Sequence, residues 1–262
     1  LLDFSVIQSP IALQLGGSDP KALLESAYIA IDCGYTEINL NCGCPSNRVQ
    51  SGEFGASLMK NPETLNNCVR LLTSKLPKNI AVTIKTRLGI DDIYSYDYLN
   101  NFIKRLIENG VNTFHIHARK ALLKGLSPKE NREVPPLNYD WVHRLKDDFP
   151  TTIFVLNGGL KNLDQIKTQL TKIDGVMLGR HAYADPYSLM EFDSQLFARS
   201  SKQLSRSRVA ALYIEYMQKQ LTQNIPLRTM SQHIINLFHG QPNSKIWRKA
   251  LTMQCRGKEL NI

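Results

Sequence analysis

Two cysteines separated by one residue, Cys42 and Cys44, follow an apolar run of the sequence. A cysteine thiol has an ordinary pKa near 8.5 and is mostly protonated at neutral pH, so it can donate a proton in a reaction. Alternatively, the pair binds a metal or packs in a core. No second cysteine pair and no histidine cluster stands at zinc spacing in the sequence, so we expect no metal site. Because neighbouring strand residues alternate sides, we expect Cys42 to point into the wall of the sheet.

Polar side chains also end other apolar runs. Lys85 ends one of them, where a charge is unfavourable unless it is exposed or meets an anion, and an interior salt bridge is the alternative. His115 and His117 alternate with apolar residues and face the same side, so their spacing alone does not distinguish them. Gln14 stands at the end of the first run, where it could serve a ligand or cap a strand.

Two glycine motifs are suited to binding an anion. They are Asn157-Gly158-Gly159 and Gly179-Arg180. Glycine permits close approach of the backbone to an anion, and a guanidinium adds charge-assisted hydrogen bonds. Gly-Gly turns also have purely structural causes, so each motif alone leaves both interpretations open. The segment Lys120–Asn138 carries Lys129 and Arg132 and is unusually long for a connecting loop, which suggests a function; a solvated lid is the alternative.

Six short β-rich runs must position these residues, each followed by a helix-like pattern. They cover Ile11–Gly17, Glu37–Gly43, Ala81–Gly89, Thr113–Arg119, Thr152–Gly159 and Gly175–Arg180. Such alternation predicts a parallel sheet of nearly continuous apolar strands, covered by helices such as Lys21–Asp32 and Tyr96–Glu108. Polar residues at the carboxyl ends of many strands indicate a (β/α)8 barrel, whereas a doubly wound sheet concentrates its chemistry at one switch point.

A barrel has eight βα units, and the sequence contains six. Barrels commonly bind phosphate after strands seven and eight, which fits the two glycine motifs if two units precede Leu1. We therefore expect residues 1–190 to form a TIM-type barrel that lacks its first two units. Residues 199–262 are expected to form a small helical domain, with helical patterns over Val209–Leu221, about Thr229–Phe238 and Ser244 to about Met253.

Composition limits the class of protein. With 262 residues and 42% hydrophobic residues the chain can bury a sizeable core, and it has no apolar run long enough to span a bilayer. Five scattered cysteines indicate free thiols in a reducing cytoplasm. Residues 199–262 hold 11 Lys and Arg against 2 Asp and Glu, which equals the whole net charge of +9. That excess predicts a polyanion-binding face.

Six motifs in order resemble the tRNA-dihydrouridine synthase family, specifically its A subfamily. The resemblance runs from about Leu1 to Trp247, and its most distinctive segment is Asn39 to Ala56 (NLNCGCPSNRVQSGEFGA). The other five are ALQLGGS from Ala12, KTRLG from Lys85, HARK from His117 through PKENR ending at Arg132, NGG from Asn157, and GR from Gly179.

The resemblance implies an enzyme that reduces uridine to 5,6-dihydrouridine in the D-loop of tRNA, at positions 20 and 20a. It implies FMN as the cofactor and NADPH as the reductant. It assigns proton donation to Cys44, tRNA contacts to Asn41, Lys129 and Arg132, and flavin contacts to Gln14, Lys85, His117, Asn157, Gly158, Gly159, Gly179 and Arg180. We expect a cytoplasmic monomer. The family's Pro-Met-Met segment is absent, and Gln232-His233 stands where the family has Arg-His.

Two other functions are compatible with parts of the sequence. A small-molecule flavin oxidoreductase of the dihydroorotate dehydrogenase type shares the barrel and cofactor, but does not need a basic tail. A non-catalytic RNA-binding protein would keep the tail without the flavin.

Overall fold

In the computed structural model, which describes residues 2–197 and 203–254, six parallel strands form one sheet. They are β1 (Ala12–Leu15), β2 (Glu37–Cys42), β3 (Ala81–Arg87), β4 (Thr113–His117), β5 (Ile153–Asn157) and β6 (Gly175–Met177). Each strand lies within one of the six runs predicted from the sequence. The strands pair in chain order, β1 through β6. Consecutive order without a switch point is the arrangement of (β/α) barrels, which confirms the predicted fold class.

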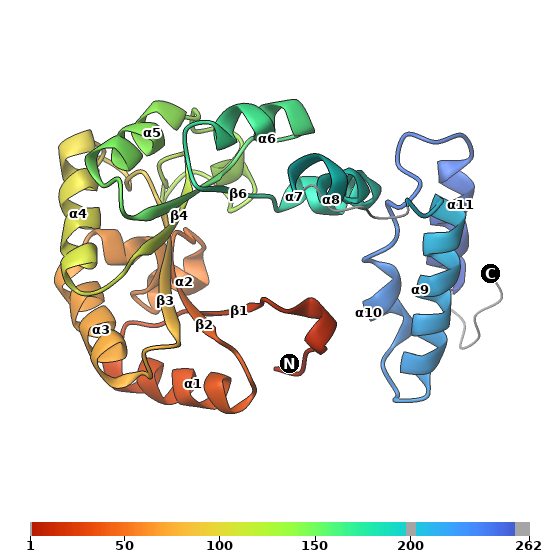
Figure 1. Ribbon diagram of the computed structural model, residues 1–262, viewed down its shortest axis with the longest axis horizontal. Helices are drawn as coiled ribbons and strands as arrows, with labels where there is room; N and C mark the ends of the chain where they lie inside the picture. Colours follow the sequence, from red (N-terminus) through yellow and green to blue (C-terminus); the bar gives the residue numbers. More distant parts are fainter. Residues whose placement is uncertain (1, 198–202, 255–262) are drawn as a thin grey trace. The chain divides into compact units, whose positions relative to one another are not determined.

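Helices follow the strands and cover one face of the sheet, as Figure 1 shows. They include α1 (Pro20–Asp32), α3 (Pro62–Lys75), α4 (Tyr96–Glu108), α5 (Tyr139–Asp148) and α6 (Leu163–Leu170). Their starts follow from local sequence, since Asp19 and Asn61 accept hydrogen bonds from the first turns of α1 and α3 and a proline follows each cap. Apolar residues at helical spacing, such as Leu99, Phe102 and Leu106, then pack against the strands.

The two faces of the sheet differ in polarity. On β2, Ile38, Leu40 and Cys42 are buried in the hydrophobic core beneath the helices. Asn39 and Asn41 alternate with them and therefore face the other way, into the barrel interior. On β2 the residues are thus apolar only toward the helices, which differs from the nearly continuous apolar run expected. The interior face is where polar side chains can meet a ligand.

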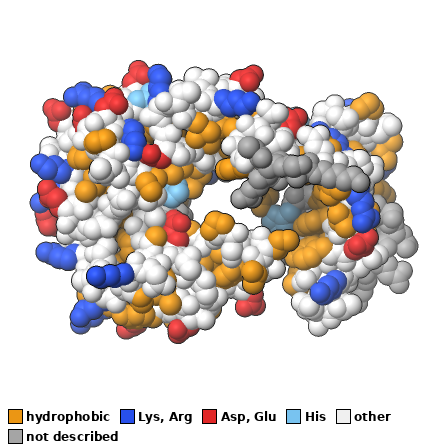
Figure 2. Space-filling model, viewed as in Figure 1, with side chains coloured by type: hydrophobic (Ala, Val, Ile, Leu, Met, Phe, Trp, Pro, Cys, Tyr) orange, Lys and Arg blue, Asp and Glu red, His pale blue; other side chains and the backbone are white. Residues whose placement is uncertain are grey.

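The structure divides into two compact units. One comprises Leu1–Leu160 with Asp164–Met177, and the other comprises Lys161–Leu163 with Leu178–Ile262. Residues 178–190, expected in the barrel domain, group with the second unit. Figure 2 shows basic and acidic side chains interspersed over the first unit, as expected from the equal numbers of basic and acidic residues in residues 1–198.

The second unit is helical. Its helices are α7 (Arg180–Ala184), α8 (Met190–Leu196), α9 (Arg206–Leu221), α10 (Leu227–Ser231) and α11 (Ser244–Gln254). The predicted helix over Thr229–Phe238 is wrong, because α10 ends at Ser231 and turns follow it. Leu237 N–H bonds the Ile234 carbonyl three residues back, and that carbonyl also accepts from Trp247 Nε1 at 3.2 Å. This tertiary contact favours the turn, while Ile234 and Leu237 stay buried as the pattern requires.

Among the described helices, none combines the length and the apolar composition needed to cross a membrane. The described residues also contain no group of three or more His, Cys, Asp or Glu side chains that could hold a metal. Four cysteines, Cys33, Cys42, Cys44 and Cys68, are free thiols, and Cys255 lies outside the described residues.

Candidate active site at the carboxyl ends of the strands

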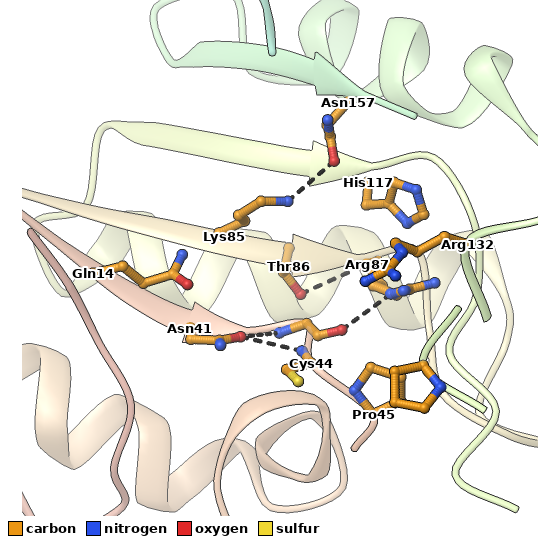
Figure 3. A pocket seen from close by; sticks show the side chains of 12 residues that line it. Gln14, Asn41, Cys44, Pro45, Lys85, Thr86, Arg87, His117, Arg132 and Asn157 are labelled. Carbon is orange, nitrogen blue, oxygen red and sulfur yellow. Dashed lines mark hydrogen bonds between the residues drawn. The ribbon is translucent and has the colours of Figure 1, made fainter. Parts of the chain in front are cut away.

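A pocket of about 280 Å³ opens where the strands of the first unit end. Its lining comprises Gln14, Asn41, Gly43, Cys44, Pro45, Lys85, Thr86, Arg87, His117, Pro128, Arg132 and Asn157. The structure therefore gathers seven of the residues singled out from the sequence. These seven are Gln14, Asn41, Cys44, Lys85, His117, Arg132 and Asn157. They come from strands and loops far apart in the chain and converge in Figure 3.

Cys44 stands on a loop whose shape is held by Asn41. The Asn41 Oδ1 accepts hydrogen bonds from the backbone N–H groups of Gly43 and Cys44, each at 3.1 Å (Figure 3). The Cys44 carbonyl accepts from Ala56 N–H at 2.9 Å, so the next turn ties the loop down as well. The Cys44 Sγ lies 3.4 Å from Ser46 Oγ and faces the pocket. The thiol is thus presented by a fixed backbone.

Cys42 has the opposite environment. Its side chain is fully buried in the core between sheet and helices, as alternation along the strand predicts. Burial raises the pKa of the Cys42 thiol far above its ordinary value. Of the two cysteines, only Cys44 is placed to meet a molecule in the pocket.

Lys85 brings a mostly buried ammonium group to the pocket. Burial, and then the charge of Arg87, lower the pKa of Lys85 to about 8. Its Nζ donates to Asn157 Oδ1 at 3.1 Å, and Asn157 Nδ2 donates in turn to the Met177 carbonyl at 2.8 Å. Figure 3 shows this pair reaching across the pocket from β3 and β5. Among the described contacts that is the ammonium's one hydrogen bond, so two N–H groups remain for a ligand.

His117 lines the pocket, whereas His115 does not. The glycine after Asn157 has a structural reason to be there: Gly158 has a φ of +108°, and a Cβ on it would lie 2.8 Å from His117 Cδ2. Gly159 (φ +76°) packs as closely against Leu137. The positive φ angles therefore give both glycines a structural reason, and their expected role at a phosphate stays a prediction.

Arg87 is a site residue that the sequence analysis missed. Its buried guanidinium donates to the carbonyls of Gly43 at 3.0 Å, Asn131 at 2.7 Å and Lys120 at 3.3 Å. Burial, as the largest cause, lowers the pKa of Arg87 to about 10. The side chain joins the Cys44 loop to the long loop. A basic residue two positions after Lys85, on the same face of the strand, was the signal that could have identified it.

Two further side chains shape the long loop, Gln50 and Asn131. Gln50 Nε2 lies 2.8 Å from both the Pro45 and the Leu123 carbonyls, and so links the same two loops as Arg87. Asn131 is completely buried. Its Oδ1 accepts a hydrogen bond from Leu122 N–H at 2.8 Å, and its Nδ2 donates to the Leu122 carbonyl at 2.9 Å. The loop is therefore held against the pocket rather than loosely solvated.

The remaining predicted residues lie outside the pocket lining. Lys129 is exposed at the start of a 3-10 turn that contains Arg132, which does line the pocket. Gly179 and Arg180 belong to the second unit, where Arg180 begins α7. Their expected contact with a phosphate stays a prediction.

Replacing Arg87 with Met is expected to lower the free energy of unfolding by about 1.5–3 kcal/mol, because buried carbonyls lose a charged donor. Denaturant titration of the variant against the wild type measures this loss. Arg70→Met, on the exposed face of α3, is the matched control and should leave the midpoint nearly unchanged. Equal midpoints for both variants would mean that the two loops do not depend on Arg87.

Comparison with known proteins identifies the family of this chain. A family model for dihydrouridine synthases matches residues 2–260. A tRNA-dihydrouridine(20/20a) synthase of Xanthomonas campestris pv. campestris is 47% identical over 96% of this chain and 74% of that protein. Proteins of the same name from Vibrio cholerae and Synechocystis sp. are 45% and 44% identical over 96% of this chain and 76% and 75% of theirs. The chain therefore belongs to the dihydrouridine synthase family, as its motifs predict.

Proposed function

We propose that this protein reduces uridine to 5,6-dihydrouridine in the D-loop of tRNA, at positions 20 and 20a, with FMN as its cofactor and NADPH as the reductant. The observation that carries the proposal is the identity of 44–47% over 96% of the chain to enzymes named for this reaction. The pocket adds the Cys44 thiol and the mostly buried Lys85 ammonium in one cavity, which supports the proposal. A cytoplasmic location is part of the proposal, since the tRNA substrate and free thiols belong there.

The pocket residues fit a flavin ring. Lys85 offers two N–H groups without a described partner, from a buried position that favours an acceptor-rich or negatively charged ring edge. Gln14 and His117 add polar contacts from β1 and β4. When bound there, reduced FMN would supply the hydride that adds to one carbon of the C5–C6 double bond of uridine. The protein must then supply the proton and hold the base.

Cys44 is the residue that we propose as the proton donor. The thiol faces the pocket on a loop fixed by Asn41 and Arg87, so it can be held on the face of the base opposite the hydride donor. The Cys44 Sγ–H proton passes to the uridine carbon that does not receive the hydride. The two hydrogens complete the reduction, and solvent later returns the proton to the thiolate.

Lys85 makes flavin binding dependent on pH. Its pKa of about 8 means that the ammonium loses its proton as pH rises through that value. A ligand that prefers the ammonium should bind with constant affinity below pH 8 and up to tenfold more weakly for each pH unit above it. Fluorescence titration of FMN from pH 6 to 9.5 measures this, and Lys85→Met should give a weaker but flat profile. A flat wild-type profile would remove Lys85 from the flavin contacts.

Lys85 also affects folding stability, which should rise with pH where the affinity for FMN falls. The unfolded pKa of lysine is about 10.4, so between pH 8 and 10.4 the unfolded chain binds more protons than the folded one. Stability of the flavin-free protein therefore gains from this group as pH rises through that window.

We propose that Gly179 and Arg180, with Asn157–Gly159, hold the FMN phosphate. Arg180→Ala is expected to weaken FMN binding by about 1.5–3 kcal/mol, the size of a charged hydrogen bond. Riboflavin, which has no phosphate, is the matched ligand and should bind both proteins alike. If Arg180→Ala bound FMN as tightly as the wild type, the phosphate would lie elsewhere.

The tRNA is proposed to contact Asn41, Lys129 and Arg132 around the pocket and the basic second unit. The side-chain oxygen of Asn41 accepts hydrogen bonds from the Cys44 loop. Its side-chain nitrogen has no described partner and could donate to RNA. The target base must leave its stack to enter the pocket, as in other enzymes that act on a base.

Incubation of the protein with FMN, NADPH and unmodified tRNA tests the function as a whole. Mass spectrometry of nuclease fragments should find two added hydrogens on the D-loop uridines. Flavin binding with no change in the tRNA, but reduction of a free pyrimidine, would favour the small-molecule oxidoreductase. Binding of tRNA without binding of flavin would favour the non-catalytic protein.

A further inference from the structure

A chain of hydrogen-bonded side chains crosses the interior face of β1, β2 and β3, beginning at the pocket. Gln14 Nε2 donates to Asn39 Oδ1 at 2.7 Å, and Asn39 Nδ2 donates to Thr83 Oγ1 at 2.8 Å. The Thr83 hydroxyl donates to Glu37 Oε1 at 2.7 Å. Strand register places Gln14, Asn39 and Thr83 side by side in one row. Asn39 and Thr83 are buried, so the middle of the chain is shielded from water, while Gln14 at the pocket end is exposed.

Only one direction of donation is consistent with a carboxylate at the end of this chain. An ionised carboxylate can only accept, so Thr83 must use its single hydroxyl hydrogen on Glu37. Thr83 Oγ1 then accepts, and Asn39 must turn its NH2 group toward it. The Asn39 oxygen therefore faces Gln14, which must present its own NH2 group. Gln14 Oε1, which has no described protein partner, is the atom left for the pocket.

Glu37 has the environment of a charged group. The His115 Nε2 lies 3.7 Å from Glu37 Oε1, and the His115 imidazole, as the largest cause, holds the pKa of Glu37 below its usual range. The hydrogen bond from Thr83 acts in the same direction. His115 on β4 thus stabilises the ionised Glu37 carboxylate, which is the acceptor at the end of the chain of hydrogen bonds.

We propose that Glu37 is a positioning residue, which acts through Thr83 and Asn39 to hold the Gln14 amide with its oxygen toward the ligand. The inference rests on the proposed function, because the ligand it concerns is the flavin. Oxidised flavin has one ring N–H group, N3–H, and an acceptor at Gln14 complements it. A reversed Gln14 amide would instead set its own N–H groups against that donor, leaving both unpaired.

Glu37→Gln tests the inference because it keeps the size of the side chain and adds N–H donors. The new amide can donate to Thr83 Oγ1, which allows Thr83, Asn39 and Gln14 to reverse in turn. We expect FMN to bind about 5- to 150-fold more weakly, the range of one unpaired polar group. N3-methyl-FMN, which lacks the ring N–H, should bind the variant and the wild type nearly equally. A purely structural defect would weaken binding of both flavins alike.

Thr83→Val provides a second break in the chain, since valine has the same shape without the hydroxyl. It should also weaken FMN binding more than N3-methyl-FMN binding. Thr113→Val is the matched control, because Thr113 occupies the same row on β4 and makes no described side-chain hydrogen bond. It should leave both flavin affinities unchanged.

The outcomes separate the inference from the function on which it rests. Wild-type protein that fails to bind FMN overturns the flavin site and the inference with it. Wild-type protein that binds FMN, together with Glu37→Gln and Thr83→Val variants that bind it equally well, overturns the inference alone. Equal losses for FMN and N3-methyl-FMN would also overturn it.

Discussion

Replacement of Cys44 with alanine is expected to slow the reduction of uridine in tRNA by about 10²–10⁴-fold, the usual contribution of a general acid. Binding of FMN and oxidation of NADPH should persist, because neither needs a proton donor on the face of the base. The change lies on a loop that Asn41 and Arg87 hold through backbone atoms, so the loop should keep its shape. Single-turnover reduction of tRNA by pre-reduced enzyme isolates the affected step.

Cys42→Ala is the matched control for this prediction. The two thiols are separated by one residue, yet Cys42 is buried in the core and does not line the pocket. Its loss should leave the rate of reduction unchanged and lower the free energy of unfolding by about 1 kcal/mol. A slow Cys42→Ala enzyme with a normal Cys44→Ala enzyme would reverse the assignment of the acid.

Much of the site could be predicted because it stands at strand ends. In parallel βα units all carboxyl ends meet at one edge, so Lys85, His117 and Asn157 converge whatever the details of the helices. Alternation along β2 likewise places Cys42 on the core face with Ile38 and Leu40, whereas Cys44 stands on the loop after the strand has ended. The alternation of side chains along a strand is a local property, and the local sequence predicts it well.

Other features depend on contacts between distant segments and were not predicted. Arg87 bonds carbonyls 44 residues away in each direction, at Gly43 and Asn131, and the sequence contains no local sign of either contact. The strands were expected to be apolar on both faces, whereas their interior face carries residues such as Asn39. The turn after α10 includes the Ile234 carbonyl that accepts a hydrogen bond from Trp247, a contact that helical periodicity does not reveal.

The affinity for tRNA is expected to fall by about 10³-fold between 50 and 200 mM salt, as for proteins that make at least six phosphate contacts. The whole net charge of the sequence lies in residues 199–262. In the described part of that segment, six basic side chains are exposed, against Glu215 as the single acid. The six are Arg208, Lys219, Arg228, Lys245, Arg248 and Lys249. Each phosphate that they neutralise releases counterions and contributes about 0.7–0.9 to the slope of log K against log salt.

Substitution of both Arg248 and Lys249 by Gln on α11 should reduce that slope by about 0.7–0.9 per charge removed. Binding should weaken for all tRNAs alike, while the choice of uridine stays the same, because a phosphate contact carries no base information. Lys75→Gln with Lys78→Gln makes the same change of charge on exposed positions of the nearly neutral first unit, and should leave the slope unaltered. If the slope of log K against log salt decreased equally in the two double variants, the attraction would come from net charge alone. The second unit would then not be the surface that holds tRNA.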